Sequence, residues 1–285
     1  MVRMGIMLAY LFFFVAASVS PLQRRQLALR RENDAGQVDF AFRVMLITFV
    51  LSAILIFFKH PEFNQSATTI TCLAAICGIF GAIGIGSQYI AQRHVEAGLT
   101  SLIGNVYTPV TIILATVLLN ESLKPLQIVG TLLLLTSVIL VSAKHRVSKW
   151  RFDKYFWLMV LSGVALGFVL TAERSLIKEN GITTGTWASW GSQTLCLGLA
   201  ALIIGRRSQY NLSDTSITGG LRFLQQLSWV VLITVVANLS VVASVTTFKI
   251  VVVFVAAAIF LNERDDLKRK IIGSLIAVFG LLLMA

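Results

Sequence analysis

The feature of the sequence that most constrains its fold is the length of its uncharged apolar runs. Between Leu227 and Leu261, for example, only Lys249 carries a charge. Such runs recur along the chain, because 56% of its residues are hydrophobic and only 13% are charged. A soluble domain carries about 25% charged residues, whereas roughly 18 consecutive apolar residues indicate a membrane-spanning helix. The sequence therefore predicts an all-α protein that crosses the membrane many times.

This composition excludes several classes of protein. A mean hydropathy of +0.83 conflicts with a soluble enzyme, a nucleic-acid-binding domain, a disordered chain or a secreted disulfide scaffold. The net charge of +11 would suggest a nucleic-acid partner for a soluble protein. In a membrane protein the same charge lies in loops and follows the positive-inside rule. We therefore expect the lipid bilayer, and no nucleic acid, as a partner.

Ten transmembrane spans can be drawn along the 285 residues. They cover approximately residues 4–22, 39–58, 69–92, 97–119, 125–143, 155–173, 183–204, 221–238, 241–261 and 270–285. At about 20 residues per span, only short loops remain between them. Two alternatives stay open: the first span could be a signal peptide, and the eighth and ninth could be one long helix with a re-entrant segment.

The lysine and arginine residues predict the orientation of the spans. Loops after the odd-numbered spans hold 17 of these residues, whereas the opposite side, which includes the N-terminus, holds five. The positive-inside rule then puts the odd-numbered loops in the cytoplasm and both termini outside. A bacterial inner membrane is the simplest host for such a chain.

The two halves of the chain resemble each other in sequence. Residues 115–121 read ATVLLNE, and residues 257–263 read AAIFLNE. Each half contains five predicted spans, so the two halves in series must lie inverted relative to each other. Inverted repeats are typical of secondary transporters, whose substrate site lies between the repeats near the middle of the membrane. We therefore divide the chain into five-helix repeats at residues 1–146 and 147–285.

These repeated segments also carry a family resemblance. Residues 107–130, with YTPV and LNESL, and residues 249–273, with KIVVV and LNER, resemble the two EamA-type repeats of the drug/metabolite transporter superfamily. Arg43, in FRVML, resembles the arginine at the start of that family's second helix. The resemblance implies a ten-helix transporter. The chain departs from the pattern in its short hairpin between spans eight and nine, and relatives are usually drawn with both termini inside.

Lys249 is an exception among charges that otherwise lie at span ends. It lies about midway along the ninth span, and Thr246 shares its face one turn earlier. A charge within the membrane is costly and indicates function, here a cation that attracts a carboxylate or phosphate. Snorkelling is the alternative, although Leu261 at the span end lies about 18 Å away along the helix. The resemblance implies a substrate role, because phosphate-exporting and nucleotide-sugar relatives also place a lysine there.

Polar faces on other spans complete the predicted substrate site. Tyr107 is equivalent to Lys249 in the repeat, since each precedes the asparagine of the shared motif by 13 residues. A wide polar arc on the fourth span should not face lipid. We expect spans three, four, eight and nine, with one and six, to surround a cavity. The candidate substrate-binding residues are Lys249, Thr246, Tyr107, Asn105, Thr108, Gln88, Trp190, Gln193 and Asn238. Helix packing is the alternative explanation of these faces.

Charges at two span ends are candidate gates that close one side of the cavity. Arg93 and Glu96 join the third and fourth spans, and Glu173 and Arg174 end the sixth. Solvated loop charge is the alternative explanation for all four residues.

Several chemical groups are missing from the predicted spans. No acidic residue is expected well inside one, and proton-coupled carriers usually need such a carboxylate or a histidine relay. The sequence therefore favours exchange or facilitated export. No acids, histidines and cysteines converge as an enzyme requires. The three cysteines lie in apolar segments away from other metal ligands. We expect neither catalysis nor a cofactor or metal.

The sequence as a whole indicates a secondary transporter that moves a small polar, anionic metabolite by alternating access. One alternative is an exporter of neutral amino acids or cationic drugs, in which Lys249 is structural. Another is a membrane structural or lipid-translocation subunit. The sequence is compatible with a homodimer, and it gives neither the substrate nor the coupling ion.

Overall fold

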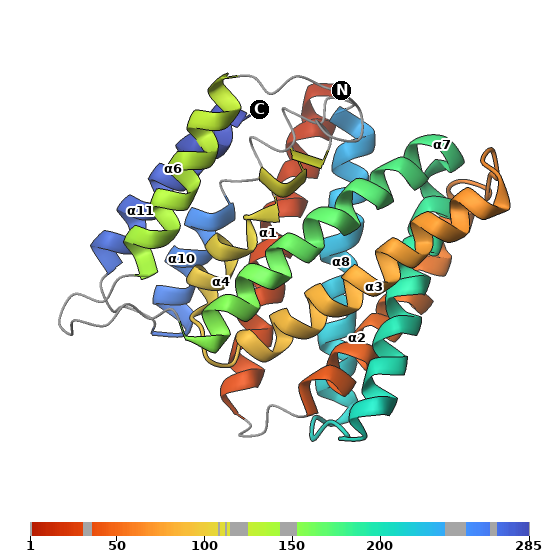
Figure 1. The fold of residues 1–285 in the computed structure, drawn as a ribbon, viewed down its shortest axis with the longest axis horizontal. Coiled ribbons are helices and arrows are strands. Elements are labelled where there is room, and N and C mark those ends of the chain that lie inside the picture. Colours follow the sequence, from red (N-terminus) through yellow and green to blue (C-terminus); the bar gives the residue numbers. More distant parts are fainter. Residues whose placement is uncertain are drawn as a thin grey trace.

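A computed structural model describes residues 2–30, 36–107, 109–111, 113–114, 125–142, 153–236, 249–262 and 267–284. These residues contain nine α-helices, one 3₁₀ helix and no strand (Figure 1). The helices are α1 (Val2–Leu29), α2 (Gln37–Leu51), η2 (Ser52–Phe57), α3 (Ala67–Ala91), α4 (Ala97–Gly104), α6 (Pro125–Ser142), α7 (Lys154–Ile204), α8 (Leu212–Val236), α10 (Lys249–Phe260) and α11 (Leu267–Met284). The predicted all-α class is confirmed.

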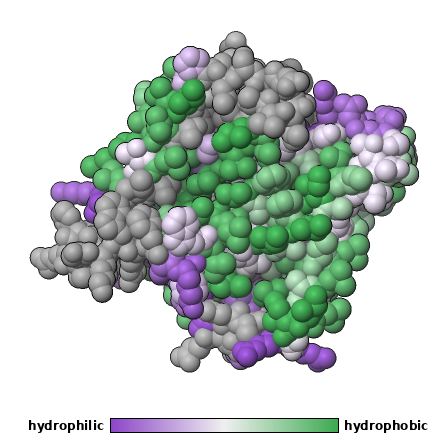
Figure 2. Space-filling view, viewed as in Figure 1, coloured by the Kyte–Doolittle hydropathy of each residue, from purple (hydrophilic) through white to green (hydrophobic). Residues whose placement is uncertain are grey.

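Four segments of the described chain are long and apolar enough to cross a membrane. They are Met7–Leu29, Gln37–Phe57, Ala67–Ala91 and Lys154–Ile204. Figure 2 shows a broad hydrophobic face over α3 and the first part of α7, with hydrophilic residues toward its margins. A surface of this kind suits contact with lipid, in which apolar side chains need no burial. The total of ten spans, their orientation and the division into two repeats stay predictions.

The long helix α7 is a hairpin of two helical arms. It covers two predicted spans, and the arms meet at Gly181, whose backbone is non-helical at φ 76° and ψ 168°. A positive φ costs an L-residue about 1–2 kcal/mol, but glycine adopts it freely. Gly185 then lets the arms approach, because a Cβ there would lie 2.6 Å from the backbone of Ile177. The first arm extends to Asn180, well beyond the predicted span end at residue 173.

Two other helices also extend beyond their predicted spans. α1 continues to Leu29 rather than ending at residue 22, and α8 begins at Leu212 rather than at residue 221. Asn211 caps the start of α8, because its Oδ1 accepts a hydrogen bond from the backbone N–H of Asp214 at 2.7 Å. Hydropathy falls at the first charged residues, but arginine and glutamine are good helix formers. Arg24, Arg25 and Arg222, which were assigned to loops, therefore belong to helices.

The helices pack in pairs around an interior space. α3 packs along α7, α1 packs along α8, and α6 pairs with α11 at one side of the molecule (Figure 1). α10 contacts α4, α1 and α11. Pro21 lies inside α1, and Phe13 of the same helix packs against Trp229 of α8 with ring centroids 6.0 Å apart. The interior is thereby enclosed by helices from both halves of the chain.

At one end of the bundle, the segment after η2 is bonded across the turn of α7. The Oδ1 atom of Asn180 accepts hydrogen bonds from the backbone N–H groups of Asn64 and Gln65, each at 3.0 Å. The hydroxyl of Thr183 donates to the carbonyl of Lys59 at 2.6 Å. These contacts tie the α2–α3 connection to the hairpin and close this end.

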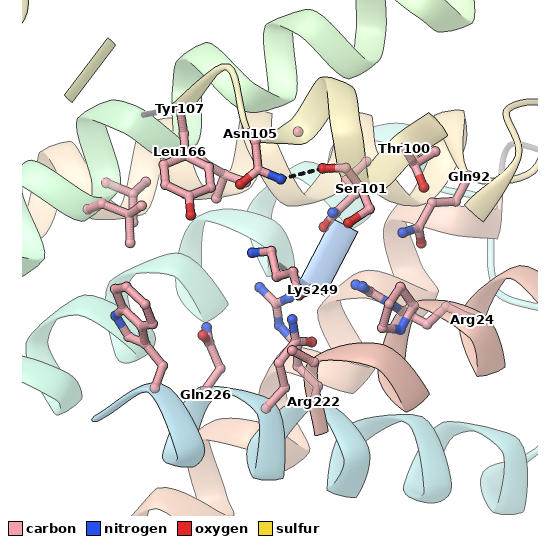
Figure 3. Close-up of a pocket in the computed structure, with 18 of the residues that line it drawn as sticks. Arg24, Gln92, Thr100, Ser101, Asn105, Tyr107, Leu166, Arg222, Gln226 and Lys249 are labelled. Atoms are coloured by element: carbon pink, nitrogen blue, oxygen red, sulfur yellow. Dashed lines mark hydrogen bonds between the residues drawn. The ribbon is translucent and has the colours of Figure 1, made fainter. Parts of the chain in front are cut away.

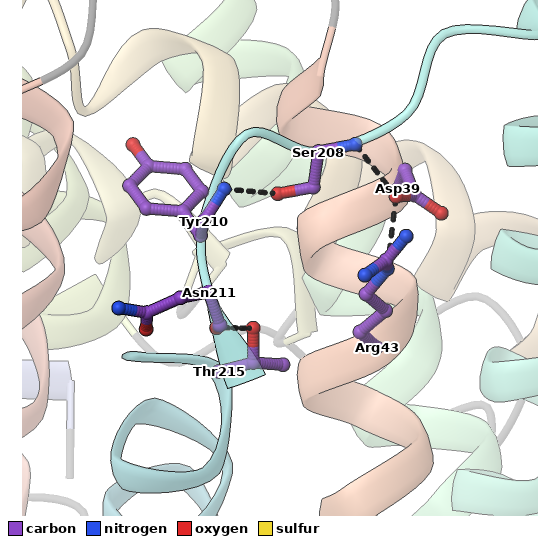
Figure 4. Close-up of polar contacts among 6 residues, drawn as sticks. All are labelled: Asp39, Arg43, Ser208, Tyr210, Asn211 and Thr215. Atoms are coloured by element: carbon purple, nitrogen blue, oxygen red, sulfur yellow. Dashed lines mark hydrogen bonds and ion pairs between the residues drawn. The ribbon is translucent and has the colours of Figure 1, made fainter. Parts of the chain in front are cut away.

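At the opposite end of α2, an acidic side chain holds the connection between α7 and α8 (Figure 4). Asp39 Oδ2 accepts a hydrogen bond from the backbone N–H of Ser208 at 2.7 Å and pairs with Arg43 Nε at 2.9 Å. Arg43 is the arginine of the family resemblance, and its side chain is 41% exposed. Arg43 therefore lies near the start of α2, away from the interior space between the helices.

Candidate substrate cavity

A cavity of about 150 Å³ lies between α1, α3, α4, α7, α8 and α10 (Figure 3). These helices include all six that were expected to surround it. Its polar lining residues are Arg24, Gln88, Gln92, Thr100, Ser101, Asn105, Tyr107, Glu173, Gln193, Arg222, Gln225, Gln226 and Lys249. Its other lining residues are Phe13, Ala17, Pro21, Gly104, Leu166, Val169, Leu170 and Trp229. The molecule thus has a polar interior between apolar outer surfaces.

Four charged side chains line this cavity. Arg24, Arg222 and Lys249 reach it from α1, α8 and α10 (Figure 3). Glu173 of α7 also lines it. Arg24 is only 3% exposed and Arg222 only 7% exposed. A charge removed from water is costly unless it is paired. Among the described residues, one carboxylate faces three cations, so the cavity has a net positive charge.

Several hydrogen-bonding atoms in the cavity wall are unsatisfied. Within the described part of the chain, Nε and Nη1 of Arg24 and Nε of Arg222 have no hydrogen-bond partner. The same holds for the side-chain oxygens of Gln88, Gln92 and Asn105. A buried polar atom left without a partner costs about 1–3 kcal/mol. The wall therefore offers both donors and acceptors to a polar solute.

Lys249 and Tyr107, the two repeat-equivalent positions, meet in the cavity. The Nζ atom of Lys249 lies 5.7 Å from the centroid of the Tyr107 ring, within the range of a cation–π contact. Asn105 precedes Tyr107 by two residues, and its Nδ2 donates to the carbonyl of Ser101 at 2.6 Å (Figure 3). The side-chain oxygen of Asn105 remains available to a solute.

Glu173 lies inside the first arm of α7 rather than at a helix end. Its Oε1 accepts a hydrogen bond from Nε1 of Trp190 on the second arm at 3.0 Å. The expectation that Glu173 ends a helix is therefore wrong. The physical reason is that the helix continues to Asn180 past the charge pair Glu173 and Arg174, where the apolar run ends.

The structure brings most of the described candidate residues together. Lys249, Tyr107, Asn105, Gln88 and Gln193 line the cavity. Trp190 is 1% exposed and stands behind the lining, where it contacts Glu173. Thr108, Thr246 and Asn238 lie outside the described residues.

The four candidate gate residues do not act as one group. Arg25 Nη1 donates to the carbonyl of Gln92 at 2.7 Å and to that of Arg93, which joins α1 to the end of α3. Glu96, at the start of α4, pairs with Lys270 of α11. Glu173 lines the cavity itself, and Arg174 is exposed. Contacts of Arg93 and Glu96 therefore lie at the end of the bundle opposite the turn of α7, and their role as gates stays a prediction.

Sequence reasoning missed Arg24 and Arg222 as cavity residues, because both were counted as loop charges. The sequence contains a signal that each of these two arginines belongs to a helix. No glycine or proline separates residue 22 from residue 29, so nothing stops α1 there. Asn211 is a strong N-cap residue ahead of α8. Helix-capping and helix-breaking signals would have placed both arginines inside helices.

The comparisons with known proteins agree with this geometry. Residues 3–143 match the model of the EamA-like transporter family. The chain belongs to this family. This EamA-type protein is thus a multi-pass membrane transporter of the drug/metabolite transporter superfamily, with the bilayer and a small-molecule substrate as partners.

Structural similarity extends over the whole EamA-type chain. A solved structure described as "Crystal structure of protein" is similar with a TM-score of 0.54, and the similarity covers 97% of each chain. The two sequences are 14% identical, so the likeness shows a shared fold alone. No curated protein matches the chain.

Proposed function

We propose that this EamA-type transporter moves a small anionic metabolite, which carries a carboxylate or a phosphate, by alternating access. The observation that carries the proposal is that Arg24, Arg222 and Lys249 face a single carboxylate in one cavity. A cavity with excess positive charge between low-dielectric walls attracts a negatively charged solute. The same field repels a cationic drug, and a neutral amino acid would leave the excess positive charge uncompensated.

The unsatisfied donors support an oxyanion as the charged part of the substrate. Hydrogen bonds between a guanidinium group and a carboxylate or phosphate are stronger than neutral ones. Arg24 and Arg222 are nearly fully buried and retain unpaired N–H groups. In the proposed complex these groups bind the oxyanion, while Gln88 and Asn105 contact the rest of the solute.

The size of the cavity supports a small solute. A volume of about 150 Å³ corresponds to roughly five water molecules. Phosphate or a short carboxylate fits such a space, whereas a larger metabolite requires the wall to move. Movement is part of the proposal, because contacts close the bundle at the turn of α7 and at the Glu96–Lys270 pair. In alternating access these two ends open in turn.

A ligand screen on the detergent-purified protein tests this proposal. Inorganic phosphate, sugar phosphates, short carboxylates, neutral amino acids and tetraphenylphosphonium are compared by thermal shift. A ligand at about 100 times its dissociation constant stabilises the protein by about 2.7 kcal/mol. Lys249→Ala and Arg222→Gln are compared with the wild type, and Lys178→Ala is the control because that side chain is 78% exposed.

We expect anions alone to stabilise the wild type and Lys178→Ala, with the shift lost in the two cavity variants. Stabilisation of the wild type by cations or neutral amino acids, equal in all variants, would contradict the proposal. Liposome uptake of the stabilising anion, followed by counterflow against the same anion, then checks that binding leads to transport.

A further inference from the structure

We propose that Glu173 couples the transport of the anion to a proton, so that the protein carries its substrate together with H⁺. The carboxylate of Glu173 binds one proton when the anion occupies the arginine site, and it releases that proton after the anion leaves. No covalent bond of the substrate changes. This inference rests on the proposed function and adds a coupling ion to it.

The position of Glu173 is the first observation behind this inference. Val169, Leu170 and Glu173 form one face of the first arm of α7, and all three line the cavity. Among the described lining residues, Glu173 is the one carboxylate. Ionisable groups inside a membrane protein are expensive to keep, and where they persist they mark substrate or proton pathways.

The hydrogen bonds around Glu173 are the second observation. Trp190 donates to its Oε1 from the second arm, and the hydroxyl of Ser189 is a neighbouring hydrogen-bonding group. Ser189 itself accepts a hydrogen bond from Nε2 of Gln193 at 2.8 Å. A carboxylate accepts the Trp190 bond, and the carbonyl oxygen of a protonated carboxyl group accepts it equally well. The surroundings therefore accommodate both protonation states.

The charges around Glu173 are the third observation. Arg222 of α8 lies within electrostatic range of its carboxylate, and Arg24 of α1 lies within range of Arg222. On α3, Cys77 lies within electrostatic range of Glu173, and Tyr89 lies within electrostatic range of Arg222. Lys249 of α10 and Tyr107 beyond α4 line the same space. Glu173 is thus the internal counter-ion of the arginines.

A bound anion changes this balance. It takes over the hydrogen bonds and the positive charge of Arg222, and it brings a second negative charge close to Glu173. A carboxylate in a low-dielectric site that loses its cation and gains an anionic neighbour favours its protonated form. By linkage, a proton on Glu173 strengthens binding of the anion by the same factor. Proton and anion therefore bind together and move in the same direction.

Transport into proteoliposomes tests this inference, with radiolabelled inorganic phosphate and succinate as probes. Each probe is added under an imposed pH gradient, alkaline inside, and in separate counterflow without a gradient. With the membrane potential held at zero by equal K⁺ on both sides and valinomycin, one proton per anion supports accumulation of about tenfold per pH unit, whatever the charge of the anion. A pH-sensitive dye inside the vesicles reports proton entry. Glu173→Gln removes the titratable group, and Glu179→Gln is the control because Glu179 is a half-exposed acid of the same helix.

We expect the wild type and Glu179→Gln to accumulate the probe and to acidify the vesicle interior. Glu173→Gln is expected to bind the probe equally well across pH and to exchange it in counterflow, without accumulation and without acidification. Glu173→Asp keeps a carboxyl group and should retain coupling, which separates loss of the proton site from loss of folding.

The outcomes distinguish this inference from the function on which it rests. Counterflow of an anion by the wild type without any response to the pH gradient overturns the role of Glu173 and leaves the anion carrier standing. Accumulation that persists in Glu173→Gln does the same. If the wild type binds and moves no anion in the screen or in liposomes, both proposals fall. Acidification by the wild type shows that protons move with the anion, and its loss in Glu173→Gln but not in Glu173→Asp assigns the proton to Glu173.

Discussion

The ammonium nitrogen of Lys249 lies 5.7 Å from the centre of the Tyr107 ring, although the two residues belong to different halves of the chain. The contact is made inside the cavity, and both residues line its wall. A cation held over an aromatic ring keeps its N–H donors free for another ligand, since the ring face takes none of them as a full hydrogen bond. The ring thus orients the ammonium group of Lys249 and leaves its N–H groups available to bind an anion.

This relationship predicts different effects for two substitutions of Tyr107. Tyr107→Phe keeps the ring and should leave the affinity for the stabilising anion within about threefold, because a cation–π contact is worth about 1 kcal/mol and is retained. Tyr107→Leu removes the ring and should weaken binding more. Isothermal titration of both variants gives the two dissociation constants. Equal losses in the two variants would mean that the hydroxyl group binds the substrate directly.

Arg222→Gln should have opposite effects on stability and on binding. Removing one of three cations relieves the repulsion between Arg222 and Arg24, while Arg24 and Lys249 still balance Glu173, so we expect the variant to be at least as stable as the wild type without ligand. A hydrogen bond to a charged group contributes about 1.5–3 kcal/mol, so the anion should bind about tenfold or more weakly. Thermal denaturation with and without the anion measures both effects.

Arg43→Gln is the matched control for that prediction. It removes an arginine that is partly exposed and pairs with Asp39 outside the cavity. Anion affinity in this variant should equal that of the wild type. A comparable loss in Arg43→Gln would indicate a general effect of protein charge rather than a binding role for Arg222.

The pair of Glu96 and Lys270 should hold one end of the bundle shut. Glu96→Gln removes the ion pair between α4 and α11, and a partly exposed pair contributes up to about 1 kcal/mol, or about fivefold in a two-state ratio. We expect faster labelling of a cysteine at position 101 by a membrane-impermeant maleimide, in a background without Cys72, Cys77 and Cys196. The charge-swapped variant Glu96→Lys with Lys270→Glu should restore slow labelling, and failure to do so argues against the pair as a gate.

Gly185→Ala should destabilise the hairpin of α7. A methyl group there would lie 2.6 Å from the backbone of Ile177, which cannot move without separating the arms. Overpacking of this kind costs about 1–3 kcal/mol, and the midpoint of thermal denaturation should fall by several degrees. Gly86→Ala is the control, because a Cβ at Gly86 meets nothing within 4 Å. Equal midpoints for the two variants would contradict the close approach of the arms.

The sequence was sufficient to predict the membrane class, and it grouped Lys249 with Tyr107, which the structure brings together in the wall of one cavity. A charge deep in an apolar run stands out because nothing near it resembles a loop. The aligned motifs then related position 107 to position 249 without any three-dimensional information. These inferences succeed because they depend on local hydropathy and on sequence register.

Hydropathy failed at Arg24, Glu173 and Arg222 for one common physical reason. A span predicted from hydropathy ends where charges appear, whereas a helix ends where its backbone hydrogen bonds stop. The charged stretches of α1, α7 and α8 remain helical, and neighbouring helices pack against these helices. Pairs such as Trp190 with Glu173 depend on how the two arms of α7 meet, which no local pattern specifies.

Pro21 gives α1 a mechanical property that its length conceals. Proline has no backbone N–H, so the carbonyl of Ala17 lacks its helical hydrogen bond at a point where both residues face the cavity. A tilt of α1 at this joint breaks no backbone hydrogen bond. The half of α1 that packs on Trp229 and the half that carries Arg24 can therefore change their relative angle at Pro21. In the proposed alternating access, bending at this joint would widen one end of the cavity while the other end keeps its contacts.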